Sequence, residues 1–132
     1  MTVEKILVVE DEPDQLELLA LQLRDEGFVV ATAANGLEAL DQVARSRPHL
    51  VVLDVSMPKM NGFTVCQKLR DNPATAAIPI LMLSGLRSQF AEWNGLAHGA
   101  SAYLTKPYQP AELISAVRRV LRAATATPAR PA

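Results

Sequence analysis

The amino-acid sequence predicts an α/β fold: a doubly wound, three-layer (βα)5 sandwich with helices on both faces of a parallel five-stranded sheet. Two observations carry this prediction. Five short apolar runs alternate with five segments whose apolar residues recur at the spacing of an amphipathic helix. Strands separated by helices join a parallel sheet through right-handed crossovers, which place helices on both faces. The length of 132 residues is that of one domain, without internal repeats.

The first strand and the helix that follows it can be bounded from the sequence. The apolar run Lys5–Val9 predicts a buried strand, and Pro13 suits the first turn of the helix that follows. Apolar residues then recur at i, i+3, i+4 and i+7, and Gly27 stops the helix. These apolar positions are Leu16, Leu19, Ala20 and Leu23.

The second unit begins with the apolar run Phe28–Ala33, which is expected to be a strand. The dipeptide Asn35-Gly36 then turns the chain. A second helix follows and ends before Pro48, because the residue that precedes a proline is biased away from the helical region. Its apolar positions are Leu37, Leu40, Val43 and Ala44.

The third unit contains the stretch on which the functional interpretation depends. Leu50–Leu53 is an apolar, partly β-branched run, typical of a strand that is buried on both faces. Asp54 ends this run, turn residues follow, and a helix is expected over Phe63–Asp71 before Asn72-Pro73 breaks it. Asp54 is therefore a carboxylate at the end of a rigid strand, where open α/β sheets bind their ligands.

The last two units complete the sheet. Ile78–Leu83 is expected to form the fourth strand, and Ala102–Thr105 a short fifth strand. Between them, a helix over Ser88–Ala97 is only loosely patterned, since Gly95 lies within it. The final helix has the most regular apolar periodicity, at Leu113, Ala116, Val117, Val120 and Leu121.

Composition and charge narrow the range of compartments and partners that are expected for this protein. The net charge of -1 gives no reason to expect a nucleic acid or an anionic membrane as partner. No apolar run approaches the roughly 20 residues of a membrane span, and the N-terminus lacks a signal-peptide pattern. The single cysteine, Cys66, is expected to be an inert core thiol and fits a reducing compartment. We therefore expect a cytoplasmic protein, with a folded domain over 1–123 and a disordered Ala/Pro/Thr-rich tail over 124–132.

Polar and charged residues follow four of the five expected strands. In a sheet of order 2-1-3-4-5, the first and third strands are neighbours at the switch point, so their carboxylates converge. Three carboxylates in one pocket repel one another and attract a hard divalent cation, for which Mg²⁺ is the natural candidate. The residues at the strand ends are Glu10, Asp11, Asp54, Ser84 and Lys106.

This set of side chains fits phosphoryl transfer. A carboxylate is a nucleophile for phosphate, so Asp54 is interpreted as the acceptor of a phosphoryl group. The Lys106 ammonium and the Ser84 hydroxyl, or nearby backbone N–H groups, would stabilise charge on the phosphoryl oxygens. Each residue alone has a plainer explanation: the acidic first turn of a helix, a helix cap or a solvated lysine. Their coincidence at strand ends favours the site.

Over about Glu4 to Ala123, the sequence resembles the receiver domains of bacterial two-component response regulators. The motifs that carry the resemblance are Glu10-Asp11, the frame D-x-x-M-P-x-M-x-G from Asp54 to Gly62, Ser84, Tyr103 and Lys106-Pro107. The resemblance implies a flavodoxin-like fold with strand order 2-1-3-4-5. It also suggests a stand-alone, single-domain receiver, which acts as a signalling switch and catalyses only its own phosphorylation and dephosphorylation.

The resemblance further implies a set of roles for the residues. A histidine kinase or histidine phosphotransfer protein would donate the phosphoryl group from a histidine to Asp54. Mg²⁺ would be held by Glu10, Asp11, Asp54 and the backbone carbonyl of Ser56.

The switching residues also follow from the resemblance. Ser84 would move toward the phosphoryl group and Tyr103 would turn inward behind it. An unknown downstream protein would then read the surface of the fourth helix, fifth strand and fifth helix, or the chain would pass the phosphoryl group on. The Lys106-Pro107 bond is expected to be cis.

Some positions depart from the commonest pattern of this family. Ser56 and Leu86, each two residues past a site residue, lack an amide or carboxylate that could orient an attacking water. We therefore expect a comparatively long-lived acyl phosphate. Gly85 is expected to loosen its loop, and Ser101-Ala102 puts one mode of dimerisation in doubt.

Residues outside the site have plainer explanations. His49 and His98 have no partner at metal-ligand spacing and suit surface or capping positions. Trp93 is either a core residue or a partner contact. A basic stripe on the last helix is either a solvated face or a docking site; its residues are Arg118, Arg119 and Arg122.

Three other functions are less well supported by the sequence. An interaction module that does not use phosphorylation is the main alternative, but here every chemical position is filled. A haloacid-dehalogenase-type phosphohydrolase needs a second Asp two residues past the nucleophile, where this chain has Ser56. A nucleotide-binding protein needs a glycine-rich loop after the first strand, where this chain has the acidic stretch EDEP.

Overall fold

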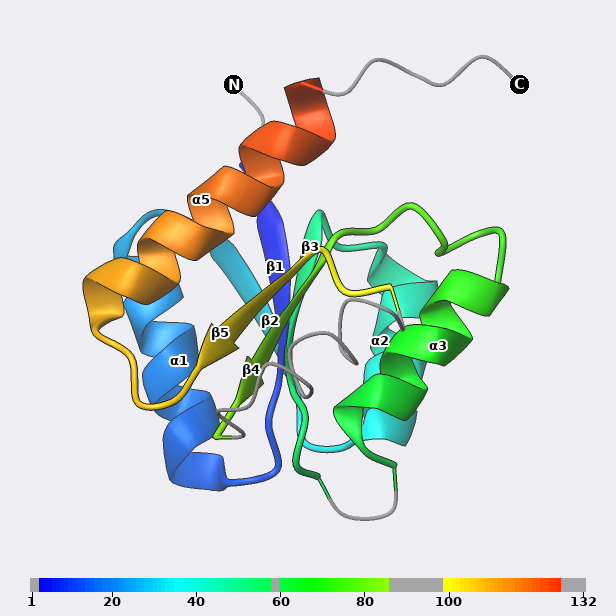
Figure 1. Cartoon of the computed structure of the whole chain (residues 1–132), viewed down its shortest axis with the longest axis horizontal. Coiled ribbons are helices and arrows are strands. Elements are labelled where there is room, and N and C mark those ends of the chain that lie inside the picture. The colour runs from blue at the N-terminus through cyan, green and yellow to red at the C-terminus, as the bar shows by residue number, and fades with distance from the viewer. Residues whose placement is uncertain (1–2, 58–59, 86–98, 127–132) are drawn as a thin grey trace.

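The computed structural model describes residues 3–57, 60–85 and 99–126 and contains one sheet of five parallel strands (Figure 1). The strand order is β2-β1-β3-β4-β5, so the predicted order 2-1-3-4-5 is confirmed. The strands are β1 (Lys5–Val9), β2 (Val29–Ala33), β3 (Leu50–Asp54), β4 (Ile80–Ser84) and β5 (Ala102–Thr105).

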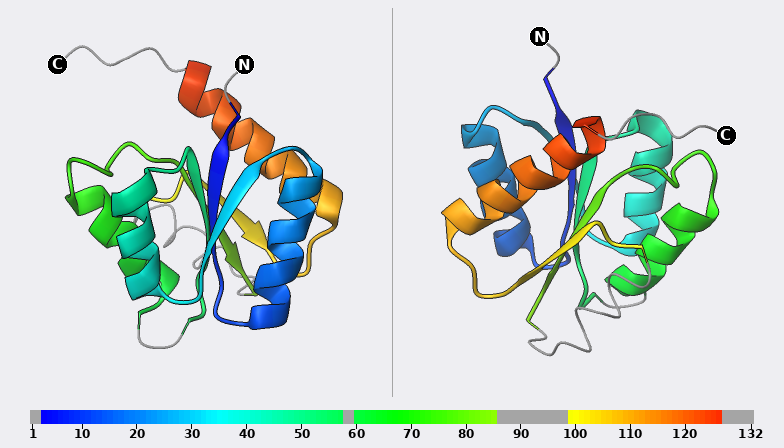
Figure 2. Two further views of the ribbon diagram at one scale, coloured as in Figure 1. Left: turned by 180° about the vertical axis from the view of Figure 1, so that it is seen from behind. Right: turned by 45° about the horizontal axis from the view of Figure 1, so that its top comes forward.

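Helices cover both faces of this sheet, as expected. The described helices are α1 (Pro13–Asp25), α2 (Gly36–Ser46), α3 (Gly62–Asp71) and α5 (Pro110–Ala126). Helices α1 and α5 lie on one face, and α2 and α3 lie on the other, as the views of Figure 2 show. The helix expected over Ser88–Ala97 lies outside the described residues.

The two faces of the sheet form two separate cores, because side chains alternate along each strand. Ile6 and Val8 of β1 belong to the core beneath α1 and α5, whereas Leu7 and Val9 belong to the core beneath α2 and α3. Strands β3 and β4 are buried along their whole length. A strand that is buried on both faces needs a continuous apolar run, and this is the pattern that the sequence contains.

Helix ends follow the turn residues of the sequence. Asn35 and Asn61 cap α2 and α3 by accepting hydrogen bonds from the N–H groups of Glu38 (2.9 Å) and Thr64 (3.0 Å). Helix α2 ends at Ser46, and its C-cap residue Arg47 has a left-handed φ of 42°. Pro48 follows at once, which disfavours a helical conformation for Arg47.

Several predicted boundaries differ from the structure. Strand β4 begins at Ile80 rather than at residue 78, because the Ile78 N–H donates to Thr75 O in a turn and Pro79 has no N–H. Asp54 and Ser84 are the last residues of β3 and β4 rather than the first residues of loops. Helix α5 continues to Ala126, past the domain boundary expected at residue 123, because its alanine-rich end favours a helix.

No helix in the described ranges is both long enough and apolar enough to cross a membrane.

Candidate functional site

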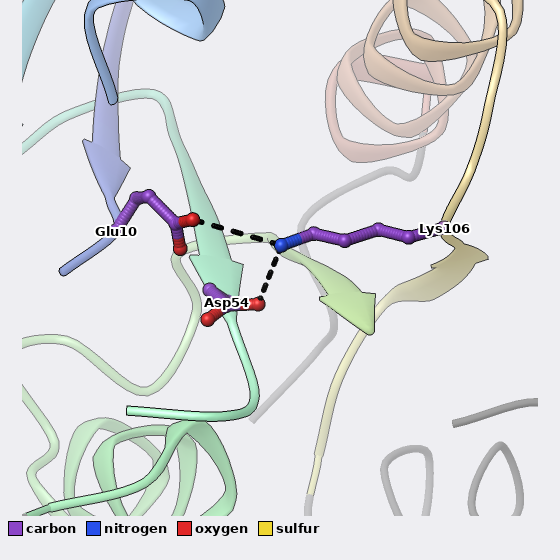
Figure 3. Close-up of polar contacts among 3 residues, drawn as sticks. All are labelled: Glu10, Asp54 and Lys106. Atoms are coloured by element: carbon purple, nitrogen blue, oxygen red, sulfur yellow. Dashed lines mark hydrogen bonds and ion pairs between the residues drawn. The ribbon is translucent and has the colours of Figure 1, made fainter. Parts of the chain in front are cut away.

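The carboxyl ends of β1, β3 and β5 bring three charged side chains together (Figure 3). Glu10 follows the last residue of β1, and Asp54 is the last residue of β3. These two strands are paired in parallel with Val9 opposite Leu53, so their carboxylates leave the sheet at neighbouring positions. Lys106 follows the last residue of β5 and reaches across toward both carboxylates. The structure thus brings these three side chains together at one edge of the sheet.

Among the described residues, Lys106 is the cation that pairs with these carboxylates. Its Nζ atom lies 3.0 Å from Asp54 Oδ1 and 3.6 Å from Glu10 Oε1. The Lys106 side chain is 25% exposed, while those of Asp54 and Glu10 are 6% and 2% exposed. Water screens such a pair poorly, so one ammonium group partly compensates two buried carboxylates.

Glu10 is the most deeply buried carboxylate of the cluster. Its Oε2 atom is buried and has no hydrogen-bond partner in the part of the chain that the structure describes. Burial first, and then the neighbouring Asp54 carboxylate, raise the pKa of Glu10 to about 7, although Lys106 acts in the opposite direction. A buried carboxylate oxygen without a partner is costly, so this position favours either a proton or a bound cation.

The carboxylates fit a magnesium ion. Glu10, Asp11 and Asp54 each offer an oxygen, and these three atoms lie within 4.8 Å of one another. Mg²⁺ binds oxygen at about 2.1 Å, so two oxygens on opposite sides of the ion lie about 4.2 Å apart. The unpartnered Glu10 Oε2 gives the cluster an oxygen that is available for a ligand bond. Asp11 is only half-buried, which leaves one side of the cluster open to water.

Ser84 lies on β4, the strand beside the Asp54 strand, and Tyr103 lies on β5, the next strand along the sheet. Ser84 ends β4 next to β3, with Leu83 opposite Asp54, and its side chain is fully buried. Tyr103 lies on β5 opposite Met82 and packs, half-buried, against the core beneath α2 and α3. The Lys106–Pro107 peptide bond is cis, as the resemblance implied. Ser56 lies in the loop after β3, with its side chain exposed.

Gly62 holds the loop that follows Asp54 close to the strand. Its N–H donates to Val55 O at 2.9 Å, which folds the first turn of α3 back onto the end of β3. A Cβ atom at this position would lie 2.5 Å from Asp54 O and 2.8 Å from Val55 Cα. The glycine of the sequence frame is therefore explained by the close approach of two backbone segments.

Tyr108 is a neighbour of the site that the sequence analysis did not single out. It is half-buried and packs against the core beneath α1 and α5. Burial, and then the charges of Glu10 and Asp54, raise its pKa to about 12. With Lys106 and Pro107 it lines a groove against α1. In the sequence, only its position two residues after Lys106 could have indicated that Tyr108 lies near the site.

Other candidate residues lie away from the carboxylate cluster. Cys66 is fully buried, and burial raises the pKa of its thiol, so the expected core thiol is confirmed. His49 Nδ1 accepts a hydrogen bond from the Lys5 N–H at the opposite end of the sheet, which is a capping role. Arg118 pairs with Glu26 at 3.0 Å. Leu86, Trp93 and His98 lie outside the described residues.

Comparison with known protein families gives a match over most of the chain. A family model described as "Response regulator receiver domain" matches residues 6–118. The chain is 42% identical over 118 residues to the response regulator PleD of Caulobacter vibrioides, a match that covers 89% of this chain and 26% of PleD. The chain also spans only about half the length of several transcriptional regulators that it matches.

Solved structures agree with this match. A putative response regulator from Chloroflexus aurantiacus has a TM-score of 0.87 and 38% identity, over 91% of this chain and 98% of that chain. The BeF3-activated N-terminal receiver domain of Klebsiella pneumoniae RstA has a TM-score of 0.82 and 36% identity, over 89% of this chain and 98% of that chain.

Proposed function

The chain belongs to the response regulator receiver domain family, and on this basis we propose that it is a signalling switch driven by phosphorylation of Asp54. The observation that supports this proposal is the contact of Lys106 with Asp54 inside a cluster of three carboxylates. A buried nucleophile beside one cation and a candidate metal site is the arrangement that phosphoryl transfer to a carboxylate requires.

The proposed reaction is a transfer from a phosphohistidine of a partner protein. An Asp54 carboxylate oxygen forms a bond with phosphorus while the bond between phosphorus and the histidine nitrogen breaks. The electron pair of the broken bond stays on the imidazole, which takes up a proton. Mg²⁺, bound by Glu10, Asp11, Asp54 and the Ser56 carbonyl, would supply positive charge to the transferred group.

The protein side chains stabilise the product of this transfer. Lys106 contacts the nucleophile at 3.0 Å before reaction, and we propose that it turns to a phosphoryl oxygen afterwards. The Ser84 hydroxyl is proposed to donate to a second phosphoryl oxygen. Because Ser84 and β5 are neighbours, movement of Ser84 is proposed to draw Tyr103 inward and to change the surface around β5 and α5.

The proposed partners follow from this chemistry. A histidine kinase or a histidine phosphotransfer protein is the donor, and an unidentified downstream protein reads the switched surface. A cytoplasmic location is part of the proposal, as is a long-lived acyl phosphate. The competing proposal is an interaction module on the same fold that binds its partner without phosphorylation.

Beryllofluoride, which mimics a phosphoryl group, separates these two proposals. We expect ¹⁹F NMR to detect a bound species when beryllofluoride and Mg²⁺ are added to the protein, as the activated RstA receiver domain suggests. The signal should be absent without Mg²⁺ and absent in Asp54→Asn. Equal signals in the wild type and in Asp54→Asn would overturn the proposed function.

A further inference from the structure

Arg70 forms a polar clamp at the end of the sheet that is opposite to Asp54. It lies in the last turn of α3, and its guanidinium donates three hydrogen bonds to backbone carbonyls. Nε donates to Gly99 O at 2.8 Å, and Nη1 donates to Ala76 O at 3.0 Å and to Ile78 O at 2.6 Å. In the described part of the chain, these partners are carbonyl oxygens and include no carboxylate. Among the residues that the structure describes, Arg70 thus serves as a hydrogen-bond donor to backbone rather than as half of an ion pair.

The clamp joins the two segments that lead into β4 and β5. Ala76 and Ile78 precede β4, and Gly99 precedes β5. Gly99 has a φ of +103°, and a Cβ atom there would lie 2.6 Å from Arg70 Cγ. The glycine thus allows both the left-handed turn and the close approach of the arginine stem.

Ser101 makes further hydrogen bonds at the same end of the sheet, between the start of β5 and the start of β4. Its N–H donates to Ile80 O at 2.7 Å, and its Oγ accepts from the Ile80 N–H at 3.1 Å. These two bonds set the register in which β5 pairs with β4. Arg70 and Ser101 therefore fix both the position and the register of the N-terminal end of β5.

Strand β5 depends on these contacts more than the other strands do. It is last in the sheet order and has only four residues, all of them only half-buried. Its C-terminal end is held by the Lys106 N–H, which donates to Ser84 O at 2.7 Å. Because only four residues separate the Ser101 and Lys106 hydrogen bonds to β4, we expect a displacement at one end of β5 to reach the other.

We propose that Arg70 is a positioning residue for phosphoryl transfer: it anchors the N-terminal end of β5 and so sets the position from which Lys106 reaches Asp54. This inference rests on the proposed function. Glu10 and Asp11 follow β1 and Asp54 ends β3, whereas the hydrogen bonds of Arg70 go to the segments that precede β4 and β5. The metal site and the Lys106 contact should therefore respond differently to loss of the clamp.

The substitution Arg70→Lys keeps the positive charge but removes the planar guanidinium group that donates hydrogen bonds to three carbonyl oxygens at once. At a temperature where the variant is fully folded, we expect Mg²⁺ affinity within about twofold of wild type. Beryllofluoride affinity in saturating Mg²⁺ should fall about tenfold or more, because misplacement by a fraction of an ångström weakens a catalytic contact. Arg45→Lys is the matched control, since Arg45 pairs with Asp41 on the exposed face of α2.

Amide hydrogen exchange gives a readout that does not need phosphorylation. In Arg70→Lys, exchange at Ser101 and at Lys106 should speed up together, while exchange at Val29 of β2, whose N–H donates to Glu4 O, should not change. A merely structural role would lower protection throughout the sheet or at Ser101 alone, and either result would overturn the inference. Equal beryllofluoride affinities in the folded variant and the wild type would also overturn it.

Ser101→Ala tests the same inference if Arg70→Lys does not fold. It removes only the Oγ acceptor, so a smaller loss of beryllofluoride affinity is expected, again with unchanged Mg²⁺ affinity. Failure of the wild type to bind beryllofluoride would refute the proposed function, and the inference with it. Normal wild-type binding with no change in the variants would refute the inference alone.

Discussion

At the scale of single residues, the site is a balance of buried charges. Two carboxylates, Glu10 and Asp54, share one ammonium group, and Glu10 Oε2 has no protein partner among the described residues. The residue types were predicted from the sequence, because each follows an apolar strand. The unpartnered oxygen and the proximity of Tyr108 were not, because both depend on how side chains from separate strands meet.

Glu10 makes the stability of the metal-free protein depend on pH. Its pKa is raised to about 7 by burial and by Asp54, so the folded protein keeps a proton that the unfolded chain releases near pH 4.5. The contribution of Glu10 to the free energy of unfolding is therefore present at low pH and is lost as the pH rises from about 4.5 to about 7. Mg²⁺ should restore it above pH 7.

Glu10→Gln isolates this effect, because the amide mimics the protonated acid. Urea unfolding without metal should show the variant more stable than wild type at pH 8 by about 1–3 kcal/mol, with a smaller difference at pH 5. The same difference at both pH values would show that Glu10 does not titrate in this range.

Lys106 should have opposite effects on metal and on phosphoryl binding. Removing its charge in Lys106→Met relieves repulsion of Mg²⁺, so Mg²⁺ affinity should rise severalfold. Beryllofluoride affinity should fall, because a positive contact to the bound group is lost. Calorimetry and ¹⁹F NMR measure the two quantities. Lys68→Met, at an exposed position of α3, is the control and should change neither; a fall in both affinities would indicate a general disruption instead.

At the scale of elements, the hydrogen bond from the Gly62 N–H to Val55 O holds the start of α3 against the end of β3, beside Asp54. Helix and strand identities were predicted correctly across the described ranges, because the apolar periodicities are regular. Boundaries were less predictable: the start of β4 depends on a turn at Thr75, and the end of α5 on helix propensity. The requirement for glycine at Gly62 depends on a contact between backbone segments, which the motif alone did not explain.

Two glycines next to the site should differ sharply on substitution. Gly62→Ala places a Cβ atom 2.5 Å from Asp54 O, so backbone must move, and we expect a loss of at least about 2 kcal/mol in unfolding free energy. A Cβ atom on Gly85 would meet nothing within 4 Å. Gly85→Ala is thus the control, with a change within about 1 kcal/mol in either direction. Similar losses in both variants would argue against the close approach at Gly62.

At the scale of the whole molecule, sheet order is what creates the site. Strands β1 and β3 are separated by a complete βα unit in the sequence but are neighbours in the sheet, and their ends bring Glu10 and Asp54 together. This convergence was predictable, because a repeated strand–helix pattern with acidic strand ends restricts the topology. The clamp at Arg70 was not, because its three carbonyl partners come from loops whose paths the sequence does not determine.

We propose above all that Asp54 accepts a phosphoryl group from a donor when Mg²⁺ is present. The most direct test is intact-mass spectrometry after incubation with a small-molecule phosphodonor, followed by peptide mapping of the modified residue. We expect one added phosphoryl group on Asp54, formed only with Mg²⁺ and absent in Asp54→Asn. An unmodified wild-type protein under these conditions, or a phosphoryl group on another residue, would contradict it.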